Sequence, residues 1–191
     1  MTMDRLILVK HAFPAIVPDA PPRTWLLSDA GRRAAARHAA QLAAYDPVSV
    51  VTSVEPKAAE TGQIIAAQIG LTAATAPGLH EHERGVVSFD GDNVFHQEIV
   101  RFFSEPAAVV YGTETADAAH ARFEVAVRAV CDAQPPGTLV VIAHGTVITL
   151  LVARANGLDP FPFWKNLGLP SSVVVERSGF RLVDTISSPA G

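Results

Sequence analysis

The sequence lacks several features that would assign it to a class at once, beginning with cysteine: Cys131 is alone among 191 residues. A single thiol cannot build a disulfide framework or a cysteine-rich zinc site within one chain, which fits a reducing, cytoplasmic compartment. Long apolar runs are also missing. The stretch from Met1 to Val9 is too short for the apolar core of a signal peptide, and no window approaches the ~18 to 20 apolar residues of a membrane span. We therefore expect a cytoplasmic protein with no membrane partner.

Positive charge is scarce as well. Lysine and arginine number 15 against 19 aspartate and glutamate residues, which gives a formal net charge of -4 and a pI near 5.9. This balance predicts no basic surface for nucleic acid. Hydrophobic residues make up 49% of the chain and charged residues 18%, a composition typical of a globular protein with a substantial core. The length and the uniform composition predict a single domain over residues 1–191.

Alternating strand and helix patterns predict the fold class. Nearly continuous runs of β-branched residues predict strands that are buried on both faces; these are Arg5–Lys10, Val48–Thr52, Thr138–Ala143 and Ser172–Glu176. Helical patterns cover Ser28–Tyr45, Glu55–Ile69, Asn93–Ser104, Thr115–Ala133 and His144–Asn156. Together they predict a three-layer α/β/α domain with a mostly parallel sheet.

Two less regular regions complete the predicted fold. The turn Arg177-Ser178-Gly179 lies between Val173–Val175 and Phe180–Val183, a pattern that favours a hairpin and an antiparallel edge strand. Residues 77–114 combine a polar loop, one helix and a connection that contains proline and glycine. This region predicts a cap-like insertion over a site.

Two histidines follow predicted strands at the point where each strand ends. His11 follows the first strand and His144 the third, and the carboxyl edge of an open α/β sheet is where ligands bind. Thr52-Ser53 end the second strand, and Lys57 lies in the first turn of the next helix, where helix amides and a cation can hold an anion. Taken singly, each histidine would equally fit a structural role, and each lysine a solvated one. Together with Lys10 they favour a site for phosphate.

Five blocks of the sequence have the order and spacing of a known set of motifs. Leu8–Ala12 resembles an Arg-His-Gly motif, and Thr52–Thr61 a block in which a Thr-Ser or Ser-Ser strand end precedes an arginine, an alanine and a threonine. Leu79–Gly85 resembles a Leu-x-Glu block, Gly112–Thr115 a Gly-Glu-Ser helix start, and His144-Gly145 a second histidine block. These are the motifs of the histidine phosphatase superfamily, the phosphoglycerate mutase-like proteins. The resemblance spans nearly the whole chain and implies a phosphoglycerate mutase-like fold.

The resemblance also implies a phosphatase that acts without metal or cofactor on a small phosphomonoester. His11 would attack phosphorus and form a phosphohistidine. Lys10, Lys57 and His144 would hold the phosphate oxygens. Glu81 would protonate the leaving oxygen and later take a proton from water, a role that requires a raised pKa of its carboxyl group.

The sequence departs from the family where phosphate is held. The family has arginine at the positions of Lys10 and Lys57, and glycine at the position of Ala12. An ammonium group cannot form the two parallel hydrogen bonds of a guanidinium, so these exchanges are not conservative. Two alternatives therefore stay open. One is phosphoryl transfer of the phosphoglycerate mutase type, although family mutases are longer, and the other is a phospho-ligand binding protein with weakened catalysis.

Further alternatives concern the loop around Glu81. Glu83 becomes the acid if the register of the loop differs from the family's. The alternation of imidazole and carboxylate from His80 to Glu83 also fits metal ligands. Because alternate residues of an extended loop point to opposite sides, we predict no metal site there. The natural substrate and the oligomeric state, including a homodimer, stay open.

Overall fold

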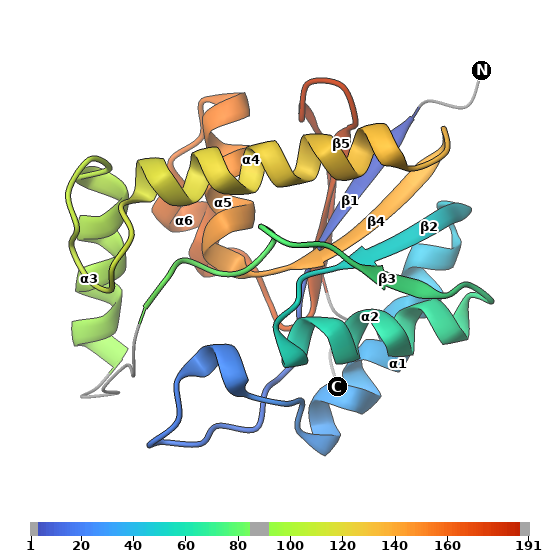
Figure 1. Cartoon of the computed structure of the whole chain (residues 1–191), viewed down its shortest axis with the longest axis horizontal. Coiled ribbons are helices and arrows are strands. Elements are labelled where there is room, and N and C mark those ends of the chain that lie inside the picture. Colours follow the sequence, from blue (N-terminus) through green and yellow to red (C-terminus); the bar gives the residue numbers. More distant parts are fainter. Residues whose placement is uncertain (1–3, 85–91, 188–191) are drawn as a thin grey trace.

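The computed structural model describes residues 4–84 and 92–187. Within this part, one sheet has the strand order β3-β2-β4-β1-β5-β6 (Figure 1). Its strands are β1 (Arg5–Lys10), β2 (Pro47–Thr52), β3 (Ala73–Thr75), β4 (Thr138–Ala143), β5 (Ser171–Glu176) and β6 (Leu182–Ser187). The first four are mutually parallel, β5 runs antiparallel to β1, and β6 is an edge strand antiparallel to β5. The predicted mostly parallel sheet with an antiparallel edge strand is confirmed.

Helices cover both faces of the sheet, which confirms the three layers (Figure 1). They are α1 (Asp29–Ala43), α2 (Pro56–Gln68), α3 (Asp92–Ser104), α4 (Ala116–Ala133), α5 (Gly145–Asn156), α6 (Pro160–Asn166) and the short 3-10 helix η1 (Pro22–Thr24). Side chains of β1 alternate between the layers. Ile7 and Val9 belong to the core with α1 and α2, whereas Leu6 and Leu8 belong to the core with α4 and α5. Burial on both faces explains why this strand is apolar along its length.

Local signals in the sequence explain where the long helices begin and end. The Ser28 side chain accepts a hydrogen bond from the N–H of Gly31 at the start of α1, at 3.0 Å. Thr115 accepts one from the N–H of Ala118 at the start of α4, at 3.1 Å. Gly157 ends α5 in the left-handed conformation with φ of 63°. These residue types are strongly preferred at such ends, so the predicted helices match the observed ones closely.

Short elements escaped the sequence analysis. β3 has three residues, too few for a period to be recognised. α6 contains two prolines, which argue against a helix in a sequence, although both lie in its first turn where proline is tolerated. The last strand begins at Leu182 rather than Phe180. Phe180 belongs to the turn, because it adopts a φ of 57° and its N–H donates to the carbonyl oxygen of Glu176.

The register of the central strands decides where the site lies. Lys10 of β1 pairs with Ala143 of β4, and Thr52 of β2 pairs with Ile142 of β4. Three neighbouring parallel strands therefore end almost level with one another. The residues that follow them emerge together at the carboxyl edge of the sheet.

The region predicted as a cap-like insertion, residues 77–114, includes α3, which lies beside α6 at one end of the molecule (Figure 1). Gly85 and the rest of residues 85–91 lie outside the described residues. Cover of the site by this insertion therefore stays a prediction. In the part of the chain that the structure describes, no helix is long and apolar enough to cross a lipid bilayer.

Candidate active site

His11 continues β1 by one residue, and its N–H donates to the carbonyl oxygen of Ala143 at 3.1 Å. The residue is 8% exposed. Nδ1 of its ring lies 2.8 Å from the carbonyl oxygen of Ala12; since a carbonyl only accepts, Nδ1 carries the proton and Nε2 keeps a lone pair. Burial, followed by the charges of His144 and Lys57, lowers the pKa of the ring well below its ordinary value. The imidazole is therefore neutral, as a nucleophile must be.

His144 follows β4, is fully buried and precedes α5. Its ring centroid lies 5.3 Å from that of His11, with the two rings edge to face. Nε2 of His144 is 2.9 Å from the hydroxyl oxygen of Ser53, the residue that follows β2. Burial, then the charge of Lys57, lowers the pKa of His144 well below its ordinary value. The structure thus brings together the two histidines that the sequence analysis singled out, both of them neutral.

The loop after His11 is held by α2. The N–H of Ala12 donates to Oγ1 of Thr61 at 3.1 Å, and that hydroxyl donates to the carbonyl oxygen of Lys57 at 2.7 Å. The methyl group of Ala12 is buried in a small apolar cluster that includes Leu27. The structure therefore accommodates the methyl group of the alanine that replaces the family's glycine.

Lys10 ends β1 and approaches from beside α5. Its Nζ donates to the carbonyl oxygen of Leu167 at 2.8 Å. A Cβ atom on Gly145 would lie 3.1 Å from Cε of Lys10, so the glycine leaves room for the lysine stem. Burial lowers the pKa of Lys10 to about 8, while the charge of Glu81 acts in the opposite direction. Lys10 therefore remains a cation at neutral pH.

Lys57 lies in the first turn of α2, but an acid that the sequence analysis missed already neutralises it. Its Nζ donates to the carbonyl oxygen of Pro22 at 2.7 Å and forms an ion pair with one oxygen of Glu55. Both side chains are buried. The other oxygen of Glu55 accepts a hydrogen bond from the N–H of Glu81 at 2.9 Å and lies 3.7 Å from Nε2 of His144. In this structure Lys57 is engaged by protein groups.

Glu81 lies against the start of α5. Its carboxylate accepts hydrogen bonds from the N–H groups of Thr146, at 3.1 Å, and Val147, at 3.2 Å. Burial acts to raise its pKa, but the nearby His144 ring, the charge of Arg84 and the backbone donors outweigh burial and hold the pKa below its ordinary value. The raised pKa that the sequence analysis required is therefore not present. The amides at the start of α5 stabilise the carboxylate, and no sequence motif predicts this contact.

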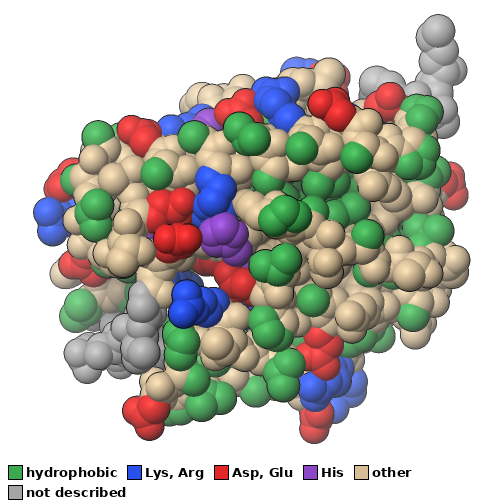
Figure 2. Space-filling view, in the orientation of Figure 1, with side chains coloured by type: hydrophobic (Ala, Val, Ile, Leu, Met, Phe, Trp, Pro, Cys, Tyr) green, Lys and Arg blue, Asp and Glu red, His purple; other side chains and the backbone are tan. Residues whose placement is uncertain are grey.

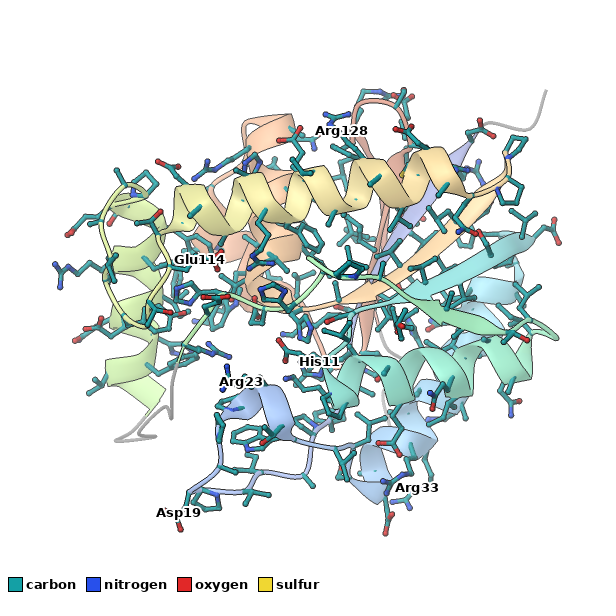
Figure 3. The ribbon with its side chains drawn as sticks, in the orientation of Figure 1. His11, Asp19, Arg23, Arg33, Glu114 and Arg128 are labelled. Atoms are coloured by element: carbon teal, nitrogen blue, oxygen red, sulfur yellow. The ribbon has the colours of Figure 1, made fainter. Side chains whose placement is uncertain are left out.

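An arginine of α4 fixes the loop that carries Glu81. Arg122 donates to the carbonyl oxygens of Gly78, His80 and Glu81, at 2.8, 3.0 and 3.2 Å. It also forms an ion pair at 2.9 Å with Glu114, which is labelled in Figure 3. Glu114 belongs to the Gly112–Thr115 block of the family resemblance. Through Arg122, this block thus helps to hold the loop that carries Glu81.

A pocket of about 670 Å³ opens beside Glu55 and Lys57. Figure 2 shows a hollow on this face, with acidic and basic side chains and a histidine gathered around it. Two arginines to which the sequence analysis gave no role also line the pocket, Arg23 from η1, labelled in Figure 3, and Arg84 from the Glu81 loop. His144 does not line the pocket, whereas Glu55, 3.7 Å from Nε2 of His144, does. Arg84 lies within the third block of the family resemblance, and Arg23 lies outside all five blocks.

Arg84 brings a guanidinium close to the site although both family arginines are replaced. Its guanidinium carbon lies 5.5 Å from the centre of the Phe95 ring. Its Nε is buried and has no hydrogen-bond partner among the described residues. The positive charge contributes to the lowered pKa of both Glu81 and His144. Arg84 is therefore a cation beside the acid and the second histidine.

The side chains from His80 to Glu83 point in different directions. Nε2 of His80 lies 3.5 Å from the carboxylate of Glu83, which is exposed at the pocket mouth. The ring of His82 packs inward against Phe102 and Tyr111, with ring centroids 4.3 and 4.7 Å apart. Within residues 4–84 and 92–187, no group of three or more His, Cys, Asp or Glu side chains is arranged to hold a metal ion.

Comparisons with known proteins concern the family and the fold of the chain. The model of the histidine phosphatase superfamily (branch 1) matches residues 19–183, a span that begins after His11. A mycobacterial glucosyl-3-phosphoglycerate phosphatase superposes with a TM-score of 0.73 at 19% identity, over 98% of this chain and 100% of that chain. YhfR of Bacillus stearothermophilus gives 0.73 at 20% identity, over 98% of each chain. A phosphoserine phosphatase mutant of Entamoeba histolytica, in complex with phosphoserine, gives 0.71 at 16% identity over 97% and 98%. None of the curated proteins compared with the chain matches significantly.

Proposed function

The chain belongs to branch 1 of the histidine phosphatase superfamily, and we propose that it is a metal-independent phosphomonoester hydrolase that forms a phosphohistidine at His11. The observation that carries this proposal is the pair of neutral imidazoles, His11 and His144, 5.3 Å apart at adjacent strand ends. The hydrogen bond from Nδ1 of His11 leaves Nε2 free to attack phosphorus. We propose a small phosphorylated metabolite as the substrate.

The reaction has two displacements. Nε2 of His11 attacks phosphorus, so that an N–P bond forms while the ester P–O bond breaks, and the leaving oxygen takes a proton from Glu81. Water then attacks the phosphohistidine and gives a proton to Glu81, the N–P bond breaks, and inorganic phosphate departs. Lys10, Lys57 and His144 hold the oxygens on which charge collects in the transition state.

The first displacement needs a protonated Glu81, although its pKa is held below the ordinary value. A bound phosphate places negative charge beside this carboxyl group, and a like charge favours the protonated form. Substrate binding therefore supports the protonation that chemistry requires. Lower pH acts in the same direction, which predicts faster turnover on the acidic side of neutrality.

One observation favours a second candidate, a phospho-ligand binding protein with weakened catalysis. Lys57, the replacement for a family arginine, is paired with Glu55 rather than left for a ligand. A pure binding protein has, however, no use for a nucleophile whose tautomer is set and whose ring is neutral. Hydrolysis is therefore the proposal that we put first.

The test is hydrolysis of p-nitrophenyl phosphate and of a panel of natural esters in EDTA by the wild type and by His11→Ala. The panel includes phosphoserine and glucosyl-3-phosphoglycerate, because structurally similar proteins are named for acting on them. It also includes 3-phosphoglycerate, whose conversion to an isomer without release of phosphate would indicate mutase activity. The matched control is His120→Ala, a partly buried histidine on α4 that pairs with Glu124.

We expect His11→Ala to lose activity by at least about a thousandfold, as removal of a nucleophile does, while His120→Ala keeps it. A contaminating phosphatase would be left equally in all three preparations. Phosphate transferred from a labelled ester should also be trapped on the wild type as an acid-labile adduct. Equal activity of the wild type and His11→Ala, or activity that EDTA abolishes, would refute the proposal. Phosphate binding without any His11-dependent turnover would favour the binding protein.

A further inference from the structure

Glu55 lies where the proposed chemistry needs a phosphate. One carboxylate oxygen is paired with Nζ of Lys57, and the other lies 3.7 Å from Nε2 of His144. These are two of the groups expected to hold phosphate oxygens. The carboxylate is a planar anion with two acceptor oxygens, so it pairs with Lys57 and lies beside His144 much as a phosphate would.

The contacts of Glu55 fix it in that place. Its N–H donates to Oγ of Ser53 at 3.3 Å, and the same hydroxyl lies 2.9 Å from Nε2 of His144. Its side-chain oxygen accepts the N–H of Glu81 at 2.9 Å. The residue is 7% exposed, and one side of it lines the 670 Å³ pocket. Glu55 thus borders both His144 and the pocket.

The charges around this position leave no place for a second anion. Lys57 and His144 face Glu55 directly, and the backbone of Glu81 contacts it, with Arg84 on the same pocket wall. A carboxylate and a doubly charged phosphate a few ångströms apart would repel each other strongly. Either Glu55 moves or phosphate does not reach Lys57.

We propose that Glu55 is a specificity-determining residue that competes with the phosphoryl group for Lys57 and the edge of His144. An incoming phosphate ester displaces the Glu55 carboxylate into the pocket, and the carboxylate returns when inorganic phosphate is formed. This exchange weakens phosphate affinity and speeds product release, so the enzyme tolerates high phosphate. The inference rests on the proposed function, because it assigns Lys57 and His144 to the phosphate site.

The test compares the wild type with Glu55→Gln, which removes the charge but keeps an oxygen for the N–H of Glu81. The probe is inorganic phosphate, measured as an inhibitor of p-nitrophenyl phosphate hydrolysis and by calorimetric titration. The control, Glu105→Gln, removes the same charge from an ion pair on the surface near the end of α3. Thermal unfolding shows whether each variant remains cooperatively folded.

We expect Glu55→Gln to bind phosphate at least about tenfold more tightly, because a like charge has gone from the binding position. KM for the ester should fall by a similar factor, and kcat should stay level or fall as product release slows. Glu105→Gln should match the wild type in all three. A merely structural role of Glu55 would weaken phosphate binding instead, and a folded Glu55→Gln with unchanged or weaker affinity overturns the inference.

A second measurement uses the wild type alone, so that a folding defect in Glu55→Gln does not decide the matter. In a crystal structure with phosphate bound beside His11, the Glu55 carboxylate should have left Lys57. Phosphate seated there with the ion pair intact overturns the inference while the proposed function stands. If neither protein binds phosphate and no His11-dependent hydrolysis occurs, the proposed function fails as well.

Discussion

The two sides of the candidate site are built by different means. On one side, His11, Ser53 and His144 follow adjacent strands, and the backbone of His11 and Ser53 bonds to β4. On the other side, Glu55 and Glu81 lie on loops, and their carboxylates take up the cations and helix amides nearby. We call these the strand side and the loop side. The strand side presents neutral groups ready to react, whereas the loop side is satisfied by its own charges.

This difference separates chemistry from affinity. Hydrogen bonds between neighbouring strands hold the backbone of the nucleophile in a fixed register, whether or not a ligand is bound. Loop side chains can exchange partners, because an ion pair between two flexible side chains is easily replaced by one with a ligand. We infer that the strand side determines whether phosphoryl transfer occurs. The loop side determines which ester reacts and at which pH the reaction is fastest.

The largest expected effect on the loop side comes from Glu81→Gln, which removes the proton donor. With alkyl phosphate esters, kcat should fall by roughly 10² to 10⁴, the usual contribution of general acid–base catalysis. With p-nitrophenyl phosphate, the first step should suffer much less, since nitrophenolate leaves without a proton. A loss of equal size in kcat/KM, which does not include the shared hydrolysis of the phosphohistidine, would mean that Glu81 positions the substrate rather than protonating it.

The pH profile sharpens the same prediction. The lowered pKa of Glu81 in the free protein means that its protonated fraction rises only as pH falls, so wild-type kcat/KM for alkyl esters should rise towards acidic pH. Protonation of His11 would end this rise, but its pKa is also lowered well below 6.5, so the rise should extend far to the acidic side. Glu81→Gln should lack the rise. A wild-type optimum in the alkaline range would contradict this assignment.

An intermediate effect is expected from Arg84→Met, compared with Arg23→Met, a change of the other arginine that lines the pocket. Arg84 is partly buried with an unpartnered Nε within the described part of the chain, whereas Arg23 is exposed. Loss of a charged hydrogen-bond donor there should lower kcat/KM about tenfold or more. Arg23→Met should have a smaller effect that disappears in high salt, as screening of an exposed charge predicts. Equal effects would mean that neither arginine contacts the substrate.

The strand side was largely legible in the sequence. An apolar run that is followed by His11, and another that is followed by His144, each predict a buried strand and the residue at which it ends. The same pattern therefore predicted both the strands and the position of the site. Caps such as Ser28 and Gly157 marked the helices between them. Short or turn-like pieces such as β3 and the start of β6 were not legible, because tertiary contacts rather than local pattern decide them.

The loop side was legible only in part. Lys57 and Glu81 were found through motif register, but their partners were not. Glu55 is two residues from Lys57 in the sequence, yet nothing in the pattern shows that its side chain turns inward to form a buried ion pair. The lowered pKa of Glu81 depends first on His144 and Arg84, and also on the amide of Thr146 at the start of α5, 65 residues away. Such long-range electrostatics follow from the fold and cannot be obtained from the spacing of residues alone.

The smallest expected effect tests the strand side through Lys10, whose pKa is lowered to about 8. Below that value Lys10 carries a positive charge that can hold a phosphate oxygen, and as pH rises through 8 the charge is lost. With p-nitrophenyl phosphate, whose leaving group needs no proton from Glu81, wild-type kcat/KM should therefore decline above about pH 8, by at most about tenfold per pH unit. Lys10→Arg should remove this decline, because a guanidinium stays protonated throughout the range. The measurement is kcat/KM for p-nitrophenyl phosphate from pH 7 to 10, with circular dichroism to confirm that both proteins are folded. Identical alkaline declines in the two proteins would mean that another group titrates there, and that phosphate is held on the strand side by His144 and backbone amides without Lys10.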